Sequence, residues 1–138
     1  MLLPNGRYTI KSGDGNRPLG VDEDRIVVLS EGDSAPEWVF ERVDSRFRIK
    51  TSDDKCVIPG DQKLWGKGEK DAKWKLEEAF HHGKNCFIIH AENGYEGWVT
   101  PYADEADNQM INRPLIVGPS YPPFFPPFER FIIERVKE

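Results

Sequence analysis

The sequence has no long hydrophobic run. No apolar stretch in its 138 residues approaches the roughly 20 residues that a membrane-spanning helix needs. The start, residues 1–5, passes straight into polar sequence and lacks the apolar core of a secretory signal peptide. We therefore expect neither a transmembrane protein nor a secreted precursor, and no membrane as a partner.

Cysteine is also scarce, since Cys56 and Cys86 are the only two. Two thiols in a chain of this length are more typical of unpaired, buried residues than of a disulfide framework. A domain of this size buries about two-thirds of its unfolded surface, so it needs neither disulfides nor a metal to fold. The length predicts one domain over residues 1–138.

Positive charge is in deficit. The 19 Lys and Arg residues are outnumbered by 24 Asp and Glu, which gives a formal charge of -5. Binding to nucleic acid without sequence preference needs clustered Lys and Arg to neutralise phosphates. Nucleic acid is therefore not an expected partner.

Aromatic residues and turn formers, by contrast, are plentiful. Four Trp, eight Phe and four Tyr argue against disorder, because disordered chains lack the residues that bury surface. Twelve Gly and eleven Pro indicate many turns. No convincing helical stripe is present, whereas short runs of alternating apolar residues are frequent. This pattern predicts a folded, loop-rich, all-β chain.

The apolar runs recur three times. An aromatic-x-Ile segment opens each unit, and the aromatic residues Tyr8, Phe47 and Phe87 lie 39 and 40 residues apart. The opening segments are 7–11, 46–50 and 86–90, and aromatic-x-apolar segments close the units at 38–43, 74–79 and 131–136. Two short predicted strands lie between them in each unit: 19–21 and 26–30, 56–59 and 63–65, and 97–100 and 114–117. Three four-strand units of about 40 residues are too few for a propeller and predict a β-trefoil.

The third unit is longer than the others and carries two insertions. One, residues 102–112, is acidic and polar. The other, residues 118–130, contains five of the eleven prolines and four aromatic residues. Proline fixes φ near -65°, so this segment has little conformational entropy left to lose when it binds a partner. A second interpretation is that its aromatic side chains fold back and cover a sheet edge.

Patterns for catalysis or metal binding are weak. Ser120 lacks the Gly-x-Ser-x-Gly context of an exposed nucleophile. His81, His82 and His90 have no ligand partners at a typical spacing, so we interpret them as solvated turn residues. The acidic groups at 22–24, 53–54 and 104–105 lack the ligand pattern of a calcium loop. We expect no enzyme, no cofactor and no metal site.

The repeat makes different predictions about which tryptophans are buried. Trp74 matches Trp38 and Phe131 and is predicted to be buried. Trp65 has no aromatic counterpart, and if exposed it would offer a stacking surface for a carbohydrate. The sequence leaves the environment of Trp98 open.

Several segments resemble the fungal serine protease inhibitors of family I66. The most specific is Arg-Pro-Leu-Ile-Val-Gly-Pro-Ser at 113–120, followed by Pro-Pro-Phe at 122–124; the others are 6–10, 22–25, 37–41 and 97–99. The resemblance covers essentially the whole chain. It implies a cytoplasmic β-trefoil without disulfides that blocks trypsin-like or chymotrypsin-like serine proteases with a surface loop. We also expect a monomer.

The resemblance leaves the reactive loop open. In the turn 22–25, Arg25 would suit a trypsin-like pocket, and Asp24 stands beside it. The acidic neighbours of Arg25 could instead pair with it. Lys55, Lys63 and Lys67 are further cationic candidates.

The segment 118–130 offers aromatic candidates for a chymotrypsin-like pocket. These are Tyr121, Phe124 and Phe125. Pro122 directly after Tyr121 would hinder attack on that bond, which favours Phe124 over Tyr121.

Two other functions stay open. Ricin-type lectins share the β-trefoil, but their Gln-x-Trp pattern is absent: Pro36, Ala72 and Glu129 stand two residues before the closing aromatics. Carbohydrate binding through Trp65 survives as a hypothesis. Fungal trefoil inhibitors of papain-like cysteine proteases also use loops, so a protease of that class is the other alternative target.

Overall fold

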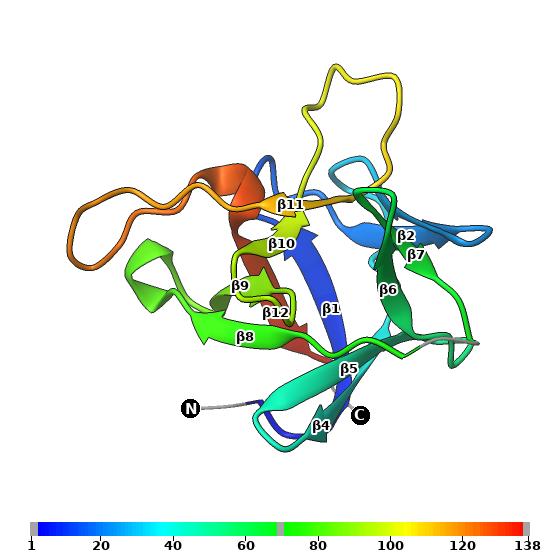
Figure 1. The fold of residues 1–138 in the computed structure, drawn as a ribbon. Coiled ribbons are helices and arrows are strands. Elements are labelled where there is room, and N and C mark those ends of the chain that lie inside the picture. Colours follow the sequence, from blue (N-terminus) through cyan, green and yellow to red (C-terminus); the bar gives the residue numbers. More distant parts are fainter. Residues whose placement is uncertain (1–2, 69–70, 137–138) are drawn as a thin grey trace.

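The described part of the chain forms twelve β-strands and two short 3-10 helices (Figure 1). The structure is a computed structural model, and it describes residues 3–68 and 71–136. In chain order the strands are β1 (Gly6–Ser12), β2 (Leu19–Asp22), β3 (Arg25–Val28), β4 (Trp38–Val43), β5 (Arg46–Thr51), β6 (Val57–Gly60), β7 (Lys63–Gly66), β8 (Lys75–Glu78), β9 (Cys86–His90), β10 (Glu96–Val99), β11 (Ile111–Pro114) and β12 (Phe131–Arg135). Helix η1 (Phe80–His82) precedes β9, and helix η2 (Pro127–Glu129) precedes β12.

Six of these strands close into a barrel. β1 pairs with β4 and β12, β4 with β5, β8 with β9, and β9 with β12, all antiparallel. Phe47 and Trp74 exchange two backbone hydrogen bonds of 2.8 Å, which join β5 to the residue before β8 and complete the ring. A closed barrel leaves no unpaired strand edge to recruit a foreign strand.

The other six strands form three hairpins, β2–β3, β6–β7 and β10–β11. One pair of residues joins the hairpins at each junction: Arg25 with Trp65, Lys63 with Ile111, and Gln109 with Val27. This register puts Ile26, Leu64 and Met110 at equivalent positions, and all three are fully buried. Six barrel strands and three hairpins in this threefold arrangement make a β-trefoil, as the sequence predicts.

The core repeats with the sequence. The inward-facing aromatic-x-Ile pairs that open the units are all buried: Tyr8 and Ile10, Phe47 and Ile49, and Phe87 and Ile89. The closing aromatics Trp38, Trp74 and Phe131 are buried as well, which confirms the prediction for Trp74. Trp98, which the sequence left open, is also fully buried. Each such side chain contributes about 1.5–3 kcal/mol through burial of apolar surface.

One predicted strand is wrong. The apolar run favoured a strand at 114–117, but β11 spans Ile111–Pro114. Met110 fills the core position that Ile26 and Leu64 fill in the other units, and this sets the register of the strand three residues earlier. Ile116 and Val117 are therefore exposed and belong to the loop that follows β11.

The described residues include two free thiols. Cys86 is buried and Cys56 is half-buried, and burial raises the pKa of each.

No helix in the described ranges is long and apolar enough to cross a membrane. Within the same ranges, no three His, Cys, Asp or Glu side chains gather as metal ligands.

Candidate functional site

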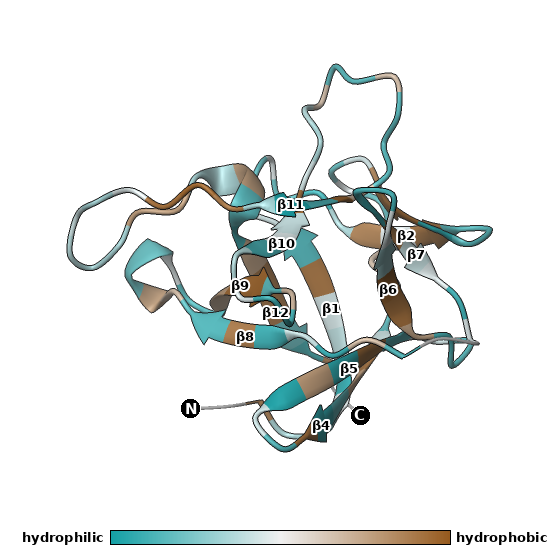
Figure 2. Cartoon of the chain, in the orientation of Figure 1, coloured by the Kyte–Doolittle hydropathy of each residue, from teal (hydrophilic) through white to brown (hydrophobic). Residues whose placement is uncertain are grey.

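The Pro/Phe loop (residues 115–126) leaves the barrel between β11 and η2 and projects to the left in Figure 1. Tyr121 at its outer end is 99% exposed, and Phe124 is 48% exposed. Figure 2 shows hydrophobic residues along both arms of the loop and more polar ones toward its tip. Large exposed apolar side chains gathered in one segment indicate a surface that binds another molecule.

The outer part of this loop is closed by contacts within the loop. The backbone N–H of Gly118 donates to the Phe124 carbonyl at 2.8 Å, and the Ser120 hydroxyl donates to the Pro122 carbonyl at 3.1 Å. A Cβ atom at Gly118 would lie 3.0 Å from the Phe124 Cβ, so this close approach favours glycine. Four prolines between 119 and 126 fix further φ angles. The tip is therefore pre-organised.

The base of the loop is anchored by Phe125. This residue is 2% exposed and packs in a small cluster with Ala79, Cys86 and Ile88. Its carbonyl accepts a 2.7 Å hydrogen bond from the Arg130 Nε–H. Phe125, one of the aromatic candidates from the sequence, thus faces the interior and fixes the loop to the barrel.

Two histidines of η1 support the loop from its side. His81 Nε2 lies 2.6 Å from the Pro123 carbonyl, and His82 Nε2 accepts the backbone N–H of Phe125 at 3.1 Å. The His82 ring also contacts the edge of Phe124, with ring centroids 5.4 Å apart.

His81 is an exposed turn residue, as predicted, although it also contacts the loop. The same prediction is wrong for His82, which is half-buried against the loop, and for His90, which lies in β9 and is 2.8 Å from Glu77.

The surroundings of His82 favour its neutral form. Desolvation lowers its pKa, the positive charge of Arg130 and the neighbouring His81 lower it further, and the Pro123 backbone acts in the opposite direction. A neutral imidazole is required here, because a protonated Nε2 could not accept the Phe125 N–H.

A buried carboxylate holds the other arm of the loop. Glu129 is completely buried, and its Oε2 accepts the backbone N–H of Ile116 at 2.7 Å. Burial raises the pKa of Glu129, while the Ile116 N–H and the positive charge of Arg113 act in the opposite direction. Both arms of the Pro/Phe loop are thus tied to the barrel by side chains outside the loop.

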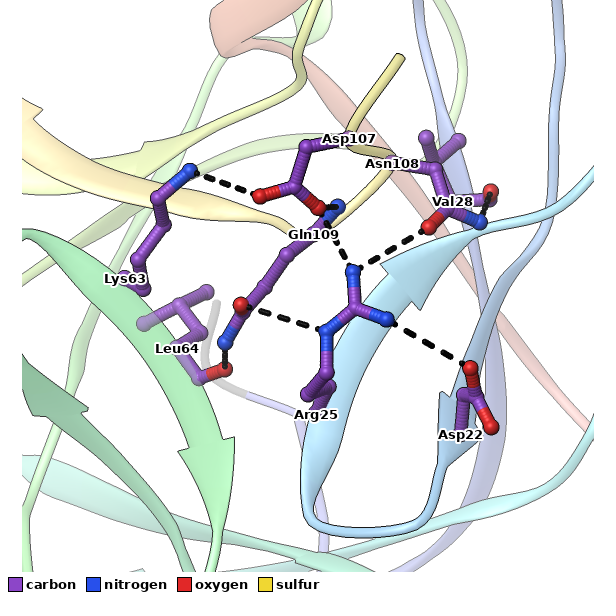
Figure 3. A network of polar contacts seen from close by, with 8 residues as sticks. All are labelled: Asp22, Arg25, Val28, Lys63, Leu64, Asp107, Asn108 and Gln109. Carbon is purple, nitrogen blue, oxygen red and sulfur yellow. Dashed lines mark hydrogen bonds and ion pairs between the residues drawn. The ribbon is translucent and has the colours of Figure 1, made fainter.

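The turn between β2 and β3 carries Arg25, and it lies at the right of Figure 1, across the molecule from the Pro/Phe loop. Figure 3 shows the Arg25 guanidinium between Asp22 and the segment 107–109. It donates to Asp107 at 2.6 Å, to Gln109 at 3.3 Å, and to Asp22 at 3.5 Å. The Arg25 side chain is 33% exposed. The alternative that neighbouring acids pair with Arg25 therefore describes this structure.

Asp107 is the centre of that network. It also binds the Lys63 ammonium at 3.2 Å and accepts the backbone N–H of Gln109 at 2.9 Å. The hydrogen bond from this N–H is the main reason why the pKa of Asp107 is lowered, and the charges of Lys63 and Arg25 lower it further. Arg25 and Lys63 together fix the end of the acidic insertion to two hairpins (Figure 3).

The backbone of the turn is engaged in the sheet. Asp22 pairs with Arg25, and Arg25 pairs with Trp65 of β7. The Asp24 carbonyl accepts the Gly66 N–H at 2.7 Å, while the exposed Asp24 carboxylate lies 3.8 Å from the Lys55 ammonium. The turn therefore offers few free backbone groups to a partner.

Trp65 is half-buried at the edge of a hollow of about 810 Å³. Its indole N–H donates to the Gly60 carbonyl at 2.8 Å, and the Lys67 ammonium lies 5.1 Å from the ring centroid. The ring is accessible, but a cation already lies over it.

Sequence reasoning did not assign a role to several residues that shape these sites. His81, His82 and Glu129 support the Pro/Phe loop, and Asp107 organises the network around Arg25. All four act across sequence separations that no local pattern reports. A Glu within an apolar and proline-rich stretch was the one available signal, since such a residue is rarely buried without a partner.

Comparison with known families gives one match over nearly the whole chain. The model of a family described as peptidase inhibitor I66 matches residues 1–135. A curated relative named "Serine protease inhibitor", from Lentinula edodes, is 33% identical over 144 residues, which cover 98% of this chain and 99% of the relative.

Solved structures agree with this match. A proteinase inhibitor from Coprinopsis cinerea superposes with a TM-score of 0.87 at 30% identity, covering 98% of this chain and all of the inhibitor. A ricin B-like lectin from Macrolepiota procera, solved in complex with lactose, superposes with a TM-score of 0.70 over 99% of this chain and all of the lectin. At 11% identity the lectin shows the shared fold alone.

Proposed function

This chain belongs to the peptidase inhibitor I66 family, and we propose that it inhibits serine endopeptidases by placing the Pro/Phe loop in the active-site cleft. Family membership makes it a protease inhibitor and not an enzyme. The serine class is supported by the name of the Lentinula edodes relative. The assignment of the loop rests on the geometry of residues 115–126.

The observation that supports the loop most strongly is the contrast between its tip and its base. Tyr121 is 99% exposed, whereas Phe125 is 2% exposed and fixed by Arg130 and His82. A protruding segment that is already ordered loses little entropy on binding, so more of its contact energy appears as affinity. A flexible loop with the same side chains would bind more weakly.

Tyr121 is the side chain best placed to enter a pocket. Phe124 lies against His82 and Arg130, so its ring would have to leave those contacts before it could insert. Tyr121 makes no such contact in the described structure, and its phenol ring suits a large apolar pocket of the chymotrypsin type. The contacts of Phe124 thus reverse the preference for it that Pro122 suggested from sequence. In a protruding inhibitory loop, slow cleavage of the Tyr121–Pro122 bond favours a long-lived complex over turnover.

Arg25 is the competing candidate for a trypsin-like pocket. Its guanidinium would have to exchange the carboxylates of Asp107 and Asp22 for that of the protease. Each surface ion pair stabilises by only about 0–1 kcal/mol, so the side chain could be released. The paired backbone of Asp22 and Arg25 is the stronger obstacle, because a substrate-like segment must offer its own backbone to the protease.

A titration against trypsin, chymotrypsin, subtilisin and papain tests the proposal. We expect inhibition of chymotrypsin at or below micromolar protein and little inhibition of papain. Inhibition of papain alone would assign the chain to the cysteine-protease class. Strong inhibition of trypsin that is lost in Arg25→Ala would move the reactive segment to the turn 22–25.

A further inference from the structure

A second hollow lies away from both loops, between β6, the β10–β11 hairpin and two connecting segments, 71–74 and 91–93. Its volume is about 390 Å³, which is in the range of pockets that bind small molecules. Apolar residues line part of it: Ile58, Pro59, Ala72, Trp74 and Ala91. Polar and charged residues from the two connecting segments and from β10 and β11 line the rest.

Asn112 is the polar residue at the buried side of this hollow. Asn112 is one of the lining residues, it is only 4% exposed, and its buried Oδ1 has no hydrogen-bond partner. The threefold register of the hairpins makes Val28 and Gly66 the equivalents of Asn112. A polar side chain therefore stands where the other two units have an apolar residue or none.

The cross-strand partner of Asn112 departs from the repeat in the same way. Trp98 faces Asn112, and its equivalents in the other hairpins are Leu19 and Val57. The buried Trp98 indole N–H has no partner, and its ring packs edge-on against Trp74 in the wall of the hollow. Each buried polar group without a partner costs about 1–3 kcal/mol, so the third unit loses stability by carrying this pair.

The charges around the hollow are mostly negative. Asp71, Glu92 and Glu96 contribute carboxylates, and Lys73 is the one cation among the lining residues that the structure describes. Asp71 is fixed by the Arg48 guanidinium at 2.9 and 3.0 Å, and Glu96 accepts the Asn93 amide N–H at 2.7 Å. Two of the three carboxylates are thus held in place, and they line the same hollow as Asn112.

We propose that this hollow binds a small organic cation with N–H donors, a guanidinium or a primary ammonium group. The donor would satisfy Asn112 Oδ1, and the carboxylates of Glu92 and Glu96 would balance its charge, since Asp71 is already paired with Arg48. The site is independent of the Pro/Phe loop, because none of the lining residues belongs to residues 115–130.

Titration with agmatine, which carries both cationic groups, tests the proposal directly. We expect saturable shifts of the Asn112 side-chain amide and the Trp98 indole signal in nitrogen-correlated NMR spectra, with a Kd of about 1 mM or tighter. Glutarate, a dianion of similar length, should leave both signals unchanged. Absence of saturable shifts with agmatine, or equal shifts with glutarate, would overturn the proposal and leave water as the occupant.

Asn112→Val supplies the decisive variant, because it introduces the residue that the first unit already has at this position. We expect the melting temperature to stay the same or rise, agmatine binding to be lost, and chymotrypsin inhibition to be unchanged. Unaltered agmatine binding would contradict the assigned role of Asn112. Glu92→Gln is a second variant at the exposed rim, and it should weaken agmatine binding several-fold whether or not the Asn112 variant folds.

Discussion

The Pro/Phe loop and the turn between β2 and β3 differ in what their most prominent side chains do. The loop exposes a large side chain, Tyr121, and its base is fixed by residues of η1 and η2 and by Arg130, between η2 and β12. In the turn, the Arg25 side chain is only 33% exposed and fixes a neighbouring segment through Asp107. A candidate anchor is therefore better judged by what holds its backbone than by the chemistry of its side chain alone.

The largest expected effect is on Tyr121. Tyr121→Ala removes the one fully exposed aromatic of the loop and should weaken inhibition of chymotrypsin by about 30-fold to 1,000-fold, the range of an interface residue that contributes 2–4 kcal/mol. Steady-state inhibition constants measure this change. Phe124→Ala is the matched control and should have a smaller effect; a larger loss for Phe124→Ala would make Phe124 the anchor.

The next effect concerns the buried support of the loop. Glu129→Leu removes the acceptor for the Ile116 N–H and leaves Arg113 without its neighbouring charge. We expect the free energy of unfolding to fall by about 1–3 kcal/mol and inhibition to weaken about tenfold. Glu129→Gln keeps an acceptor oxygen, so it should retain most of the stability and most of the inhibition. Equal losses in the two variants would show that charge, and not the hydrogen bond, is what matters.

Acid should loosen the loop through His82. Its pKa is lowered in the folded state, so its contribution to stability is fully present above the ordinary histidine pKa of about 6.5 and is lost as the pH falls through the folded-state value. Between pH 7 and 5 we expect faster hydrogen exchange at the Phe125 amide, measured after correction for intrinsic exchange. His82→Gln offers an acceptor that does not titrate, so exchange at the Phe125 amide should depend less on pH in this variant. An unchanged dependence on pH would refute the role of His82.

The smallest expected effect is on Arg25. Arg25→Ala breaks exposed ion pairs to Asp22 and Asp107 and should lower the free energy of unfolding by no more than about 1 kcal/mol. We expect faster hydrogen exchange in residues 102–109 and no change in chymotrypsin inhibition. A loss of inhibition in this variant larger than in Tyr121→Ala would reverse the comparison.

The repeat made the fold predictable from sequence. The aromatic residues that open the units recur at regular spacing, those that close them begin the same aromatic-x-apolar pattern, and all of them are buried as the pattern predicts. The strand β11 was predicted too late, because a local apolar run at 115–117 was stronger in sequence than the single Met110 that sets the register. Apolar character alone could not separate a buried strand from an exposed loop arm.

The site was predictable in part. Prolines and aromatics marked the Pro/Phe loop, and the acidic residues beside Arg25 raised the alternative of an ion pair. The sequence could not show which loop aromatics face solvent, because Tyr121 and Phe125 differ only in tertiary packing. It also could not assign His82 or Glu129 to the loop, since both act through contacts between distant segments.

Hydrogen exchange of the inhibitor in complex with chymotrypsin tests the central claim most directly. The protease used should have its catalytic serine replaced by alanine, so that no cleavage occurs. We predict protection of the backbone amides in 116–121 and 124–125, with the amides in 22–26 unchanged. Protection of 22–26 without protection of the Pro/Phe loop would contradict the account.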